Sequence, residues 1–261
     1  MTPLAGRTIL VTRAEGQGGD LTRSLEALGA TVVEAPLIAF EPPADWSPVD
    51  RALRRPGDYH AVLLTSATTA RSLARRMEDT GIEPASWAAA RLVAIGPATA
   101  AAARSIFGAR VDEVSGDFRA EGLVEMLRAE GTLRGRRLLL PRAEVARELL
   151  PESLRSLGAQ VDVVVVYRTV RLSLPAGVRA RLQSGAIDAV TFASASAVES
   201  FVADSGGAAM PRSVVVAALG PVTADAARAN GLEPRVVPPR ATAADLAEAL
   251  ARFWESGQAS R

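Results

Sequence analysis

The chain has 261 residues, 48% of them apolar, and its 30 basic and 29 acidic residues leave a formal net charge of +1. Such a composition is typical of a globular protein with one large or two small domains, and the balanced charge disfavours nucleic acid as a partner. Cysteine and lysine are both absent, which excludes thiolate metal sites, thiol nucleophiles, Schiff-base lysines and the P-loop lysine.

Short apolar runs alternate with segments of helical periodicity along the chain. Strands are predicted at 7–12, 61–64, 91–95, 136–140, 161–166, 188–192 and 213–219. Helices are predicted between them, for example at 20–28, 68–79 and 98–107. Continuous apolar strands are typical of buried parallel sheets. The alternation therefore predicts the α/β class, with two similar parallel-sheet domains flanked by helices.

The second half of the chain repeats the first. Four segments recur in the same order: GRTILVTR at 6–13 and GRRLLLPR at 135–142, HAVLLTS at 60–66 and DAVTFAS at 188–194, LVAIGPATA at 92–100 and VAALGPVTA at 216–224, AEGLVEML at 120–127 and AADLAEAL at 243–250. A shared Leu-Gly-Ala, at 28–30 and 157–159, adds a fifth match. Repetition alone leaves open whether each half is a domain or whether the halves exchange segments.

Two segments have the composition of linkers, the Pro-rich and acidic stretch at 40–48 and the stretch at 168–175. A chain that crosses between domains at both places makes one domain discontinuous. No uncharged apolar run reaches the ~18 residues that a membrane span needs, and the N-terminus lacks a signal-peptide pattern. We therefore expect a cytoplasmic protein that has no membrane partner.

Four loops follow predicted strands and open helices, where parallel sheets bind ligands. Two of them are rich in hydroxyl groups, 65–68 with Thr65 and Ser66, and 193–196 with Ser194 and Ser196. Small hydroxyl residues there either cap the following helix or leave its N–H groups available to an anion. The placement of two such loops at matched positions favours an anion-binding role.

The other two loops read Gly-Pro-x-Thr, from Gly96 to Thr99 and from Gly220 to Thr223. Glycine allows a tight turn from strand to helix, and proline suits the first helical position. The helix N–H groups then point outward and suit a carboxylate or phosphate, although a turn without a ligand has the same pattern. Neither loop matches a nucleotide-binding fingerprint.

Single residues complete the predicted site. Arg13 and Arg142 end matched strands, where each either forks onto a carboxylate or forms a salt bridge. Tyr167, one of two tyrosines, ends an apolar strand, where its phenol either assists proton transfer or packs in the core. His60, the only histidine, is interpreted as structural. The sequence thus predicts a two-domain α/β protein that holds an anionic ligand in a cleft between the domains.

Taken together, the motifs resemble those of the uroporphyrinogen-III synthase family over nearly the whole chain. The residues that carry the resemblance are VTR at 11–13, LTS at 64–66, IGPAT at 95–99, VYR at 166–168, FAS at 192–194 and LGPVT at 219–223. The resemblance implies two α/β domains joined by a two-stranded linker. It places residues 1–38 and 169–261 in one domain and residues 39–168 in the other.

The resemblance also implies an activity. The family substrate is hydroxymethylbilane, a linear tetrapyrrole with eight carboxylates, which a cofactor-independent lyase closes to uroporphyrinogen III with inversion of ring D and loss of water. Tyr167 matches the family tyrosine proposed to assist departure of the hydroxyl. The matching threonines and strand-end serines line the substrate cleft. We accordingly expect a monomer that uses a small-molecule substrate and neither metal nor cofactor.

Two other functions share these features. Synthase-like domains also serve as ligand-sensing regulators, usually with an added DNA-binding module, and no helix-turn-helix is visible beside the two halves. A cleft-closing binding protein for a small anion is the second alternative. Either one binds its ligand without forming product.

Overall fold

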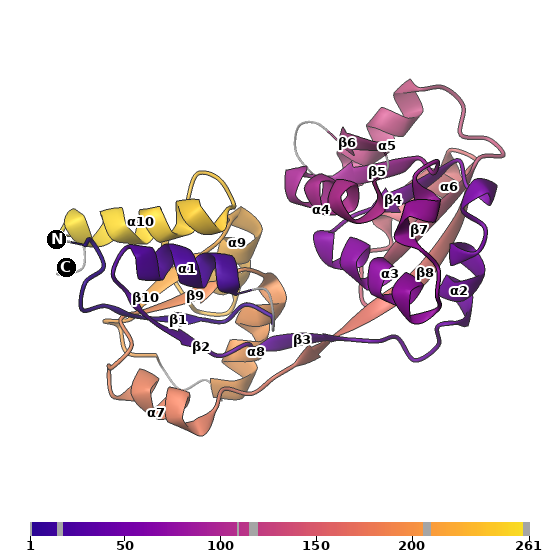
Figure 1. Cartoon of the computed structure of the whole chain (residues 1–261). Helices are drawn as coiled ribbons and strands as arrows, with labels where there is room; N and C mark the ends of the chain where they lie inside the picture. The colour runs from indigo at the N-terminus through magenta and orange to yellow at the C-terminus, as the bar shows by residue number, and fades with distance from the viewer. Residues whose placement is uncertain (1, 15–17, 109, 115–119, 206–209, 258–261) are drawn as a thin grey trace. The chain divides into compact units, whose positions relative to one another are not determined.

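Two separate β-sheets organise the chain (Figure 1). The computed structural model describes residues 2–14, 18–108, 110–114, 120–205 and 210–257. The chain folds into two compact units, of which unit 1 comprises Met1–Phe40 and Val170–Arg261, and unit 2 comprises Glu41–Thr169. The chain therefore passes twice between the units.

Unit 1 contains a five-stranded sheet with the order β11-β10-β9-β1-β2, in which every neighbouring pair is parallel. Its strands are β1 (Thr8–Val11), β2 (Thr31–Glu34), β9 (Ala189–Phe192), β10 (Val215–Ala218) and β11 (Pro234–Val236). Its helices are α1 (Gly19–Ala27), α7 (Ala176–Gln183), α8 (Ala195–Ser205), α9 (Pro221–Ala229) and α10 (Ala243–Glu255). Helices α1 and α10 pack on one face of this sheet, and α7, α8 and α9 pack on the other.

Unit 2 contains a six-stranded sheet with the order β3-β8-β7-β4-β5-β6. Its strands are β4 (Ala61–Leu64), β5 (Leu92–Ile95), β6 (Val111–Val114), β7 (Arg137–Ala143) and β8 (Gln160–Arg171). Strand β3 (Ile38–Glu41) joins this sheet at its edge, but only its Glu41 belongs to unit 2, and the last two residues of β8 belong to unit 1. Its α-helices are α2 (Ser47–Leu53), α3 (Ala67–Asp79), α4 (Pro97–Phe107), α5 (Ala120–Ala129) and α6 (Leu149–Ser156), and two 3₁₀ turns cover Pro56–Asp58 and Pro84–Trp87. Helices α2, α3 and α4 cover one face, and α5 and α6 cover the other.

The two sheets have the same strand order once the sequence repeat is taken into account. Strands β11, β10, β9, β1 and β2 of unit 1 correspond to β6, β5, β4, β7 and β8 of unit 2. Each unit therefore combines the beginning of one repeat with the end of the other. The halves of the sequence exchange segments, which answers the question that the repetition left open.

The strands are apolar because both of their faces are covered. Along β4, Ala61 and Leu63 face the helices α5 and α6, whereas Val62 and Leu64 face α2, α3 and α4. All four side chains are buried, as alternation between two packed faces requires. The α/β class with helix-flanked parallel sheets, predicted from such runs, is thereby confirmed.

Helix α3 shows why these segments become helices. Ala70, Leu73, Ala74 and Met77 are buried at a spacing that forms one stripe on a 3.6-residue helix. Ser66 precedes the helix and accepts a hydrogen bond from the Thr69 amide at 3.1 Å, which caps its first turn. The cap and the apolar stripe together fix where the helix starts and which side faces the sheet.

The segments at 40–48 and 168–175, expected to be linkers, contain regular structure at the crossings. Strand β3 reaches Glu41, and β8 continues to Arg171. Within unit 1 the Leu172 amide donates to the Leu37 carbonyl at 2.9 Å, and within unit 2 Arg168 pairs with Glu41 at 2.7 Å. Strands therefore occupy only the first residues of each segment, up to Glu41 and Arg171, and residues 42–46 and 172–175 lie outside helices and strands.

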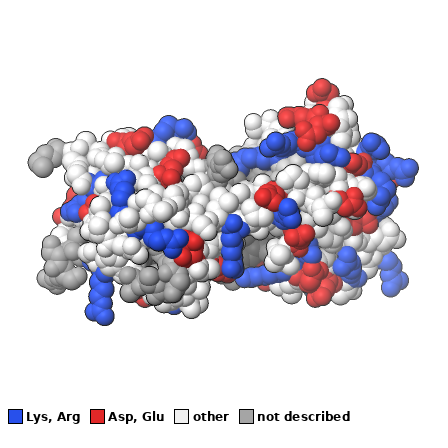
Figure 2. Space-filling model, turned by 90° about the horizontal axis from the view of Figure 1, so that it is seen from below, with Lys and Arg blue, Asp and Glu red and all other residues white. Residues whose placement is uncertain are grey.

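Acidic and basic side chains are interspersed on the surface, as Figure 2 shows for one face of the molecule. This mixture agrees with the net charge of +1. Across the described residues no helix combines the length and the apolar character that crossing a membrane requires.

Candidate functional site

The predicted site residues of unit 2 lie along one edge of its sheet. Ser66 follows β4, Gly96 follows β5, and Arg142 and Tyr167 lie in the later parts of β7 and β8. The order β8-β7-β4-β5 makes these four strands neighbours, and the pairs β7–β8, β4–β7 and β4–β5 are parallel. Their carboxyl ends therefore meet at the same edge.

Unit 1 repeats this arrangement with the corresponding residues. Arg13 follows β1, Ser194 follows β9 and Gly220 follows β10. The three strands are parallel neighbours in the order β10-β9-β1. Each sheet thus brings an arginine from one sequence repeat beside a serine loop and a Gly-Pro loop from the other repeat.

In both sheets the strand that leads to the arginine, β7 or β1, lies next to the strand that leads to the serine, β4 or β9. The order in which the chain adds strands to the sheet reverses between these two neighbours. In unit 2 the chain moves from β4 outward through β5 and β6, and then returns to β7 and β8 on the other side of β4. In unit 1 the reversal lies between β1 and β9. Such reversals open a crevice beyond the carboxyl ends of the strands, the usual ligand position in open α/β sheets.

The serines act as helix caps. Ser66 accepts from the Thr69 amide at 3.1 Å and contacts the Thr69 hydroxyl at 2.9 Å, and Ser194 accepts from the Ala197 amide at 3.2 Å. Each cap satisfies one of the N–H groups that begin α3 or α8. Thr65 is half-buried next to Ser66, and Ser196 is exposed on the first turn of α8.

The two Gly-Pro loops differ in backbone conformation. Gly96 has φ 82° and ψ 154°, a region that only glycine adopts readily. Gly220 has φ −163° and ψ 175°, an extended conformation open to any residue. The backbone therefore favours glycine at Gly96 but not at Gly220, where the strand continues extended into the helix start.

Both Gly-Pro loops leave the following helix without a side-chain cap. Glycine has no side chain to accept from the first N–H groups of α4 and α9, in contrast to the serine loops. Thr99 and Thr223 lie within the first turns and are 5% and 6% exposed. The uncapped amides at the ends of β5 and β10 are suited to an anion, since the helix dipole adds positive charge there.

Arg142 is held in place but keeps one donor unused. Its side chain is 13% exposed, Nη2 pairs with Glu148, and Nη1 lies 3.4 Å from the Arg147 carbonyl. Nε is buried and has no hydrogen-bond partner among the described residues. An unsatisfied buried donor is costly unless a ligand completes it. Arg13, its counterpart in unit 1, is half-buried.

The sequence reasoning missed Glu148, which orients Arg142. Glu148 precedes α6, and no motif marks it. Its pairing with Arg142 depends on the path of the loop after β7, which the sequence pattern does not encode.

Tyr167 lies beside a β-bulge within β8 and not at the end of a strand as predicted, because β8 continues to Arg171. Arg142 pairs with Val165 whereas Ala143 pairs with Tyr167, so one extra residue of β8 is accommodated between them. Bulges redirect side chains and are common near active sites. The Tyr167 side chain is half-buried against the core of unit 2, and its carbonyl accepts from the Glu144 amide at 2.9 Å.

His60 lies at the opposite edge of the same sheet, before β4. Its ring nitrogens face two arginines, Arg91 at 3.4 Å and Arg136 at 3.2 Å. Burial, together with the charges of Arg136 and Arg91, lowers the pKa of His60 below its usual value. Among the described residues, no three acidic, histidine or cysteine side chains gather as metal ligands do.

Comparison with known proteins locates this arrangement in a family. The family model described as uroporphyrinogen-III synthase HemD matches residues 19–248, which include every predicted site residue except Arg13. The chain belongs to the uroporphyrinogen-III synthase family. It is 32% identical over 203 residues to the uroporphyrinogen-III synthase of Synechococcus elongatus, an alignment that covers 76% of this chain and 75% of the relative.

Two further relatives extend the likeness. The uroporphyrinogen-III synthase of Chlorobaculum parvum is 24% identical over 248 residues, covering 94% of this chain and 98% of that protein. A crystal structure of a mutant uroporphyrinogen III synthase from Thermus thermophilus shares the fold, with a TM-score of 0.63 over 97% of this chain and 99% of that one at 22% identity. These likenesses bear out the family resemblance of the motifs, and the alternative of a ligand-sensing regulator has no support among them.

Proposed function

We propose that the chain closes hydroxymethylbilane to uroporphyrinogen III, inverting ring D and releasing water. The family match across residues 19–248 carries this proposal, because it spans both units and both sets of strand-end loops. The two units are, in this proposal, the two domains expected from the sequence. Dehydration and carbon–carbon bond formation exchange no electrons, so the reaction requires neither a redox cofactor nor an oxidant.

Substrate binding is assigned to the strand-end loops. Eight carboxylates need many donors, and the uncapped amides of α4 and α9 supply several without a large positive charge. In unit 2, Arg142 presents a buried, unused Nε at the same edge of the sheet as the start of α4, and a substrate carboxylate would satisfy it. The other residues assigned to binding are Arg13, Thr65, Ser66, Gly96, Thr99, Ser194, Ser196, Gly220 and Thr223.

Tyr167 is assigned to the departure of the substrate hydroxyl. The C–O bond breaks as the hydroxyl leaves with a proton as water, and the remaining pyrrole becomes an electrophilic azafulvene. A phenol that donates a hydrogen bond to the leaving oxygen assists this step. The half-buried position of Tyr167 next to the bulge supports the assignment, since its ring packs against the core of unit 2 beside the end of β7.

The remaining steps depend on conformation. The substituted carbon of ring D attacks the azafulvene and forms a spiro intermediate. The bond between this carbon and its original methylene bridge then breaks, and the bridge bonds to the opposite α-carbon of ring D. Loss of the proton from that carbon restores the aromatic pyrrole. Without restraint, direct closure gives the symmetric isomer I. Donors fixed on rigid strand ends select the spiro route by positioning the substrate.

Isomer analysis tests the proposal. Hydroxymethylbilane is generated in situ, the purified protein is added, and the products are oxidised and separated by chromatography. Predominant isomer III supports the synthase activity. Isomer I alone, from a protein shown to be folded by circular dichroism, contradicts it.

A further inference from the structure

A second anionic-ligand site is suggested by a pocket at the opposite edge of the unit 2 sheet. The pocket has a volume of about 600 Å³. Its lining residues are Pro48, Arg51, Ala52, Arg54, Arg55, Asp58, Tyr59, Arg137, Val161, Asp162, Val163 and Val164. Small-molecule pockets are typically of this size and combine apolar walls with a few polar groups.

The pocket is separate from the strand-end loops. Arg137 begins β7, whereas Arg142 lies near its end, and five residues of extended strand correspond to about 16 Å. The hollow exists because β3 borders only the later part of β8, where Arg168 pairs with Glu41. The first residues of β8, from Val161 to Val164, are left to form a wall.

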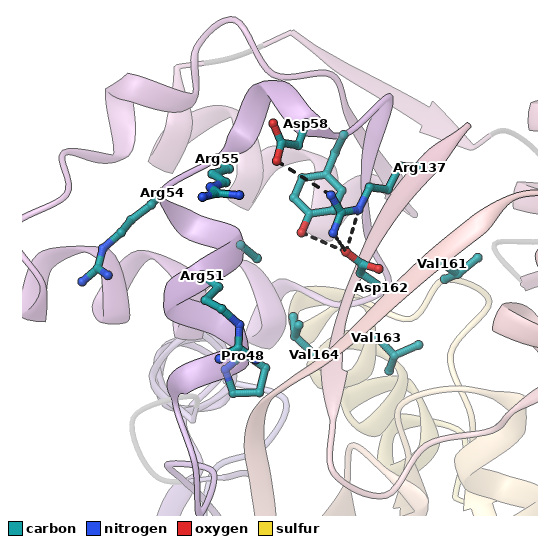
Figure 3. A pocket seen from close by; sticks show the side chains of 12 residues that line it. Pro48, Arg51, Arg54, Arg55, Asp58, Arg137, Val161, Asp162, Val163 and Val164 are labelled. Atoms are coloured by element: carbon teal, nitrogen blue, oxygen red, sulfur yellow. Dashed lines mark hydrogen bonds and ion pairs between the residues drawn. The ribbon is translucent and has the colours of Figure 1, made fainter. Parts of the chain in front are cut away.

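One side of the pocket is fixed by hydrogen bonds and ion pairs, and its arginine and two aspartates give it a charge of −1. Arg137 donates through Nε to Asp162 at 2.9 Å, lies 3.7 Å from Asp58, and stacks on the Tyr59 ring at 5.2 Å from its centroid (Figure 3). The Tyr59 hydroxyl donates to Asp162 at 3.1 Å. Burial and the Asp162 charge raise the pKa of Tyr59 to about 12, so the phenol stays protonated at neutral pH.

The other side carries uncompensated positive charge. Arg51, Arg54 and Arg55 project from α2 and the turn after it, across from Asp162, with Arg54 extending furthest outward (Figure 3). None of the three forms an ion pair with a carboxylate in the described part of the chain. Four arginines and two aspartates leave the pocket with a charge of +2.

The dipole of α2 does not by itself account for the grouping of the three arginines. Cations near the end of a helix interact favourably with its dipole, which suits Arg51 and Arg54 on α2. Arg55 lies beyond the helix, and like charges one turn apart repel each other. The negative charge of an anion offsets this repulsion, and its oxygens suit the forked donors of arginine.

We propose that this pocket binds a small organic polyanion, with phosphate or carboxylate groups on Arg51, Arg54 and Arg55 and an apolar body against Pro48, Ala52 and Val164. The site is distinct from the one assigned to the tetrapyrrole and does not depend on the proposed function. Its chemistry suits two kinds of ligand, phosphate esters and aromatic polycarboxylates.

Calorimetric titration at constant ionic strength tests the proposal. The probes are ATP for the phosphate ester, mellitate for the aromatic polycarboxylate, and tripolyphosphate for an anion without an apolar body. We expect saturable binding of ATP or mellitate, weaker binding of tripolyphosphate, and loss of affinity with added salt. The member of the pair that binds more tightly identifies the ligand class.

Two double variants locate the binding. R51Q/R55Q removes two pocket charges one helical turn apart and is expected to weaken binding by about tenfold or more, because each charge-assisted hydrogen bond is worth at least that factor. R71Q/R75Q makes the same change on exposed arginines of α3 and is expected to stay within about twofold. Thermal melts establish that both variants are folded.

Three results overturn the proposal. One is the absence of saturable binding by ATP and mellitate, and another is equal loss of affinity in the two double variants. The third is binding that survives R51Q/R55Q but disappears in R142Q, which assigns the anion to the strand-end site.

Discussion

Thr12 and Thr191 tie the two sequence repeats together inside unit 1. The Thr12 hydroxyl donates to the Thr191 carbonyl at 2.7 Å, and the Thr191 hydroxyl donates to the Leu10 carbonyl at 3.1 Å. Both side chains are buried, at 0% and 1% exposure. These bonds join β1 to β9 at the reversal of strand order, directly below the loops that carry Arg13 and Ser194.

Replacing Thr191 by valine tests this link. The change keeps the shape of the side chain but removes the hydroxyl, so we expect a loss of about 1 kcal/mol of unfolding free energy in urea. Thr31→Val makes the same change at an exposed position of β2 in the same sheet and serves as the control. Equal stability of the two variants would contradict a structural role for the buried hydrogen bond.

The glycines of the two Gly-Pro loops are expected to differ. Gly96→Ala places a side chain at φ 82°, which costs about 1–3 kcal/mol of unfolding free energy. Gly220→Ala keeps an allowed extended backbone, and its new Cβ lies 3.4 Å from the Ala241 Cβ, so we expect a much smaller loss. Chemical denaturation of both variants gives the comparison, and a larger loss for Gly220→Ala contradicts the backbone argument.

Sequence patterns predicted the central strands because both faces of each are buried. They missed β6 and β11 for the converse reason. β6 reads Val-Asp-Glu-Val, since this edge strand is covered less completely, and β11 has three residues beginning at Pro234. Short or polar edge strands lack the continuous apolar run on which the prediction rests.

The repeated sequence alone could not predict the exchange of segments, which only the family resemblance implied, for a different reason. Strands β4 and β9 are equally apolar, so either could pair with β1 as far as burial is concerned. The choice depends on tertiary contacts such as the Thr12–Thr191 bond. In the site, the capping role of Ser66 follows from local sequence, whereas the pairing of Arg142 with Glu148 depends on a loop path that local sequence does not specify.

Arg142 is expected to contribute to substrate binding. Arg142→Ala removes the buried Nε and the charge beside the serine loop, and we expect kcat/KM to fall by about tenfold or more. Arg142→Lys keeps the positive charge but lacks the forked donors of the guanidinium group, so its kcat/KM should lie between those of the parent and of Arg142→Ala. Arg104→Ala removes a half-exposed arginine paired with Glu113 and is the control. Steady-state kinetics in which the Arg104 and Arg142 variants behave alike contradict the assignment.

His60 gives unit 2 a pH-dependent stability. Because its folded pKa is lowered, protonation favours the unfolded chain, so its contribution is present above the unfolded pKa of about 6.5 and is lost as pH falls below it. We expect His60→Gln to lose less stability than the parent between about pH 7.5 and 5.5. Urea unfolding at both pH values measures the difference, and identical slopes with pH contradict the prediction.

Tyr167 is expected to act in turnover and not in folding. Tyr167→Phe removes the phenolic hydroxyl beside the bulge of β8 while keeping the ring that packs on the core, so kcat should fall by about tenfold or more with little change in melting temperature. Tyr59→Phe removes the other tyrosine hydroxyl, which donates to Asp162 at the start of β8, and should lower stability while leaving turnover near the parent value. The pair separates a hydroxyl on β8 that is assigned to chemistry from a hydroxyl that donates to β8 from the turn before β4. Unchanged turnover in a folded Tyr167→Phe variant removes Tyr167 from the mechanism and leaves positioning by the strand-end donors as the source of catalysis.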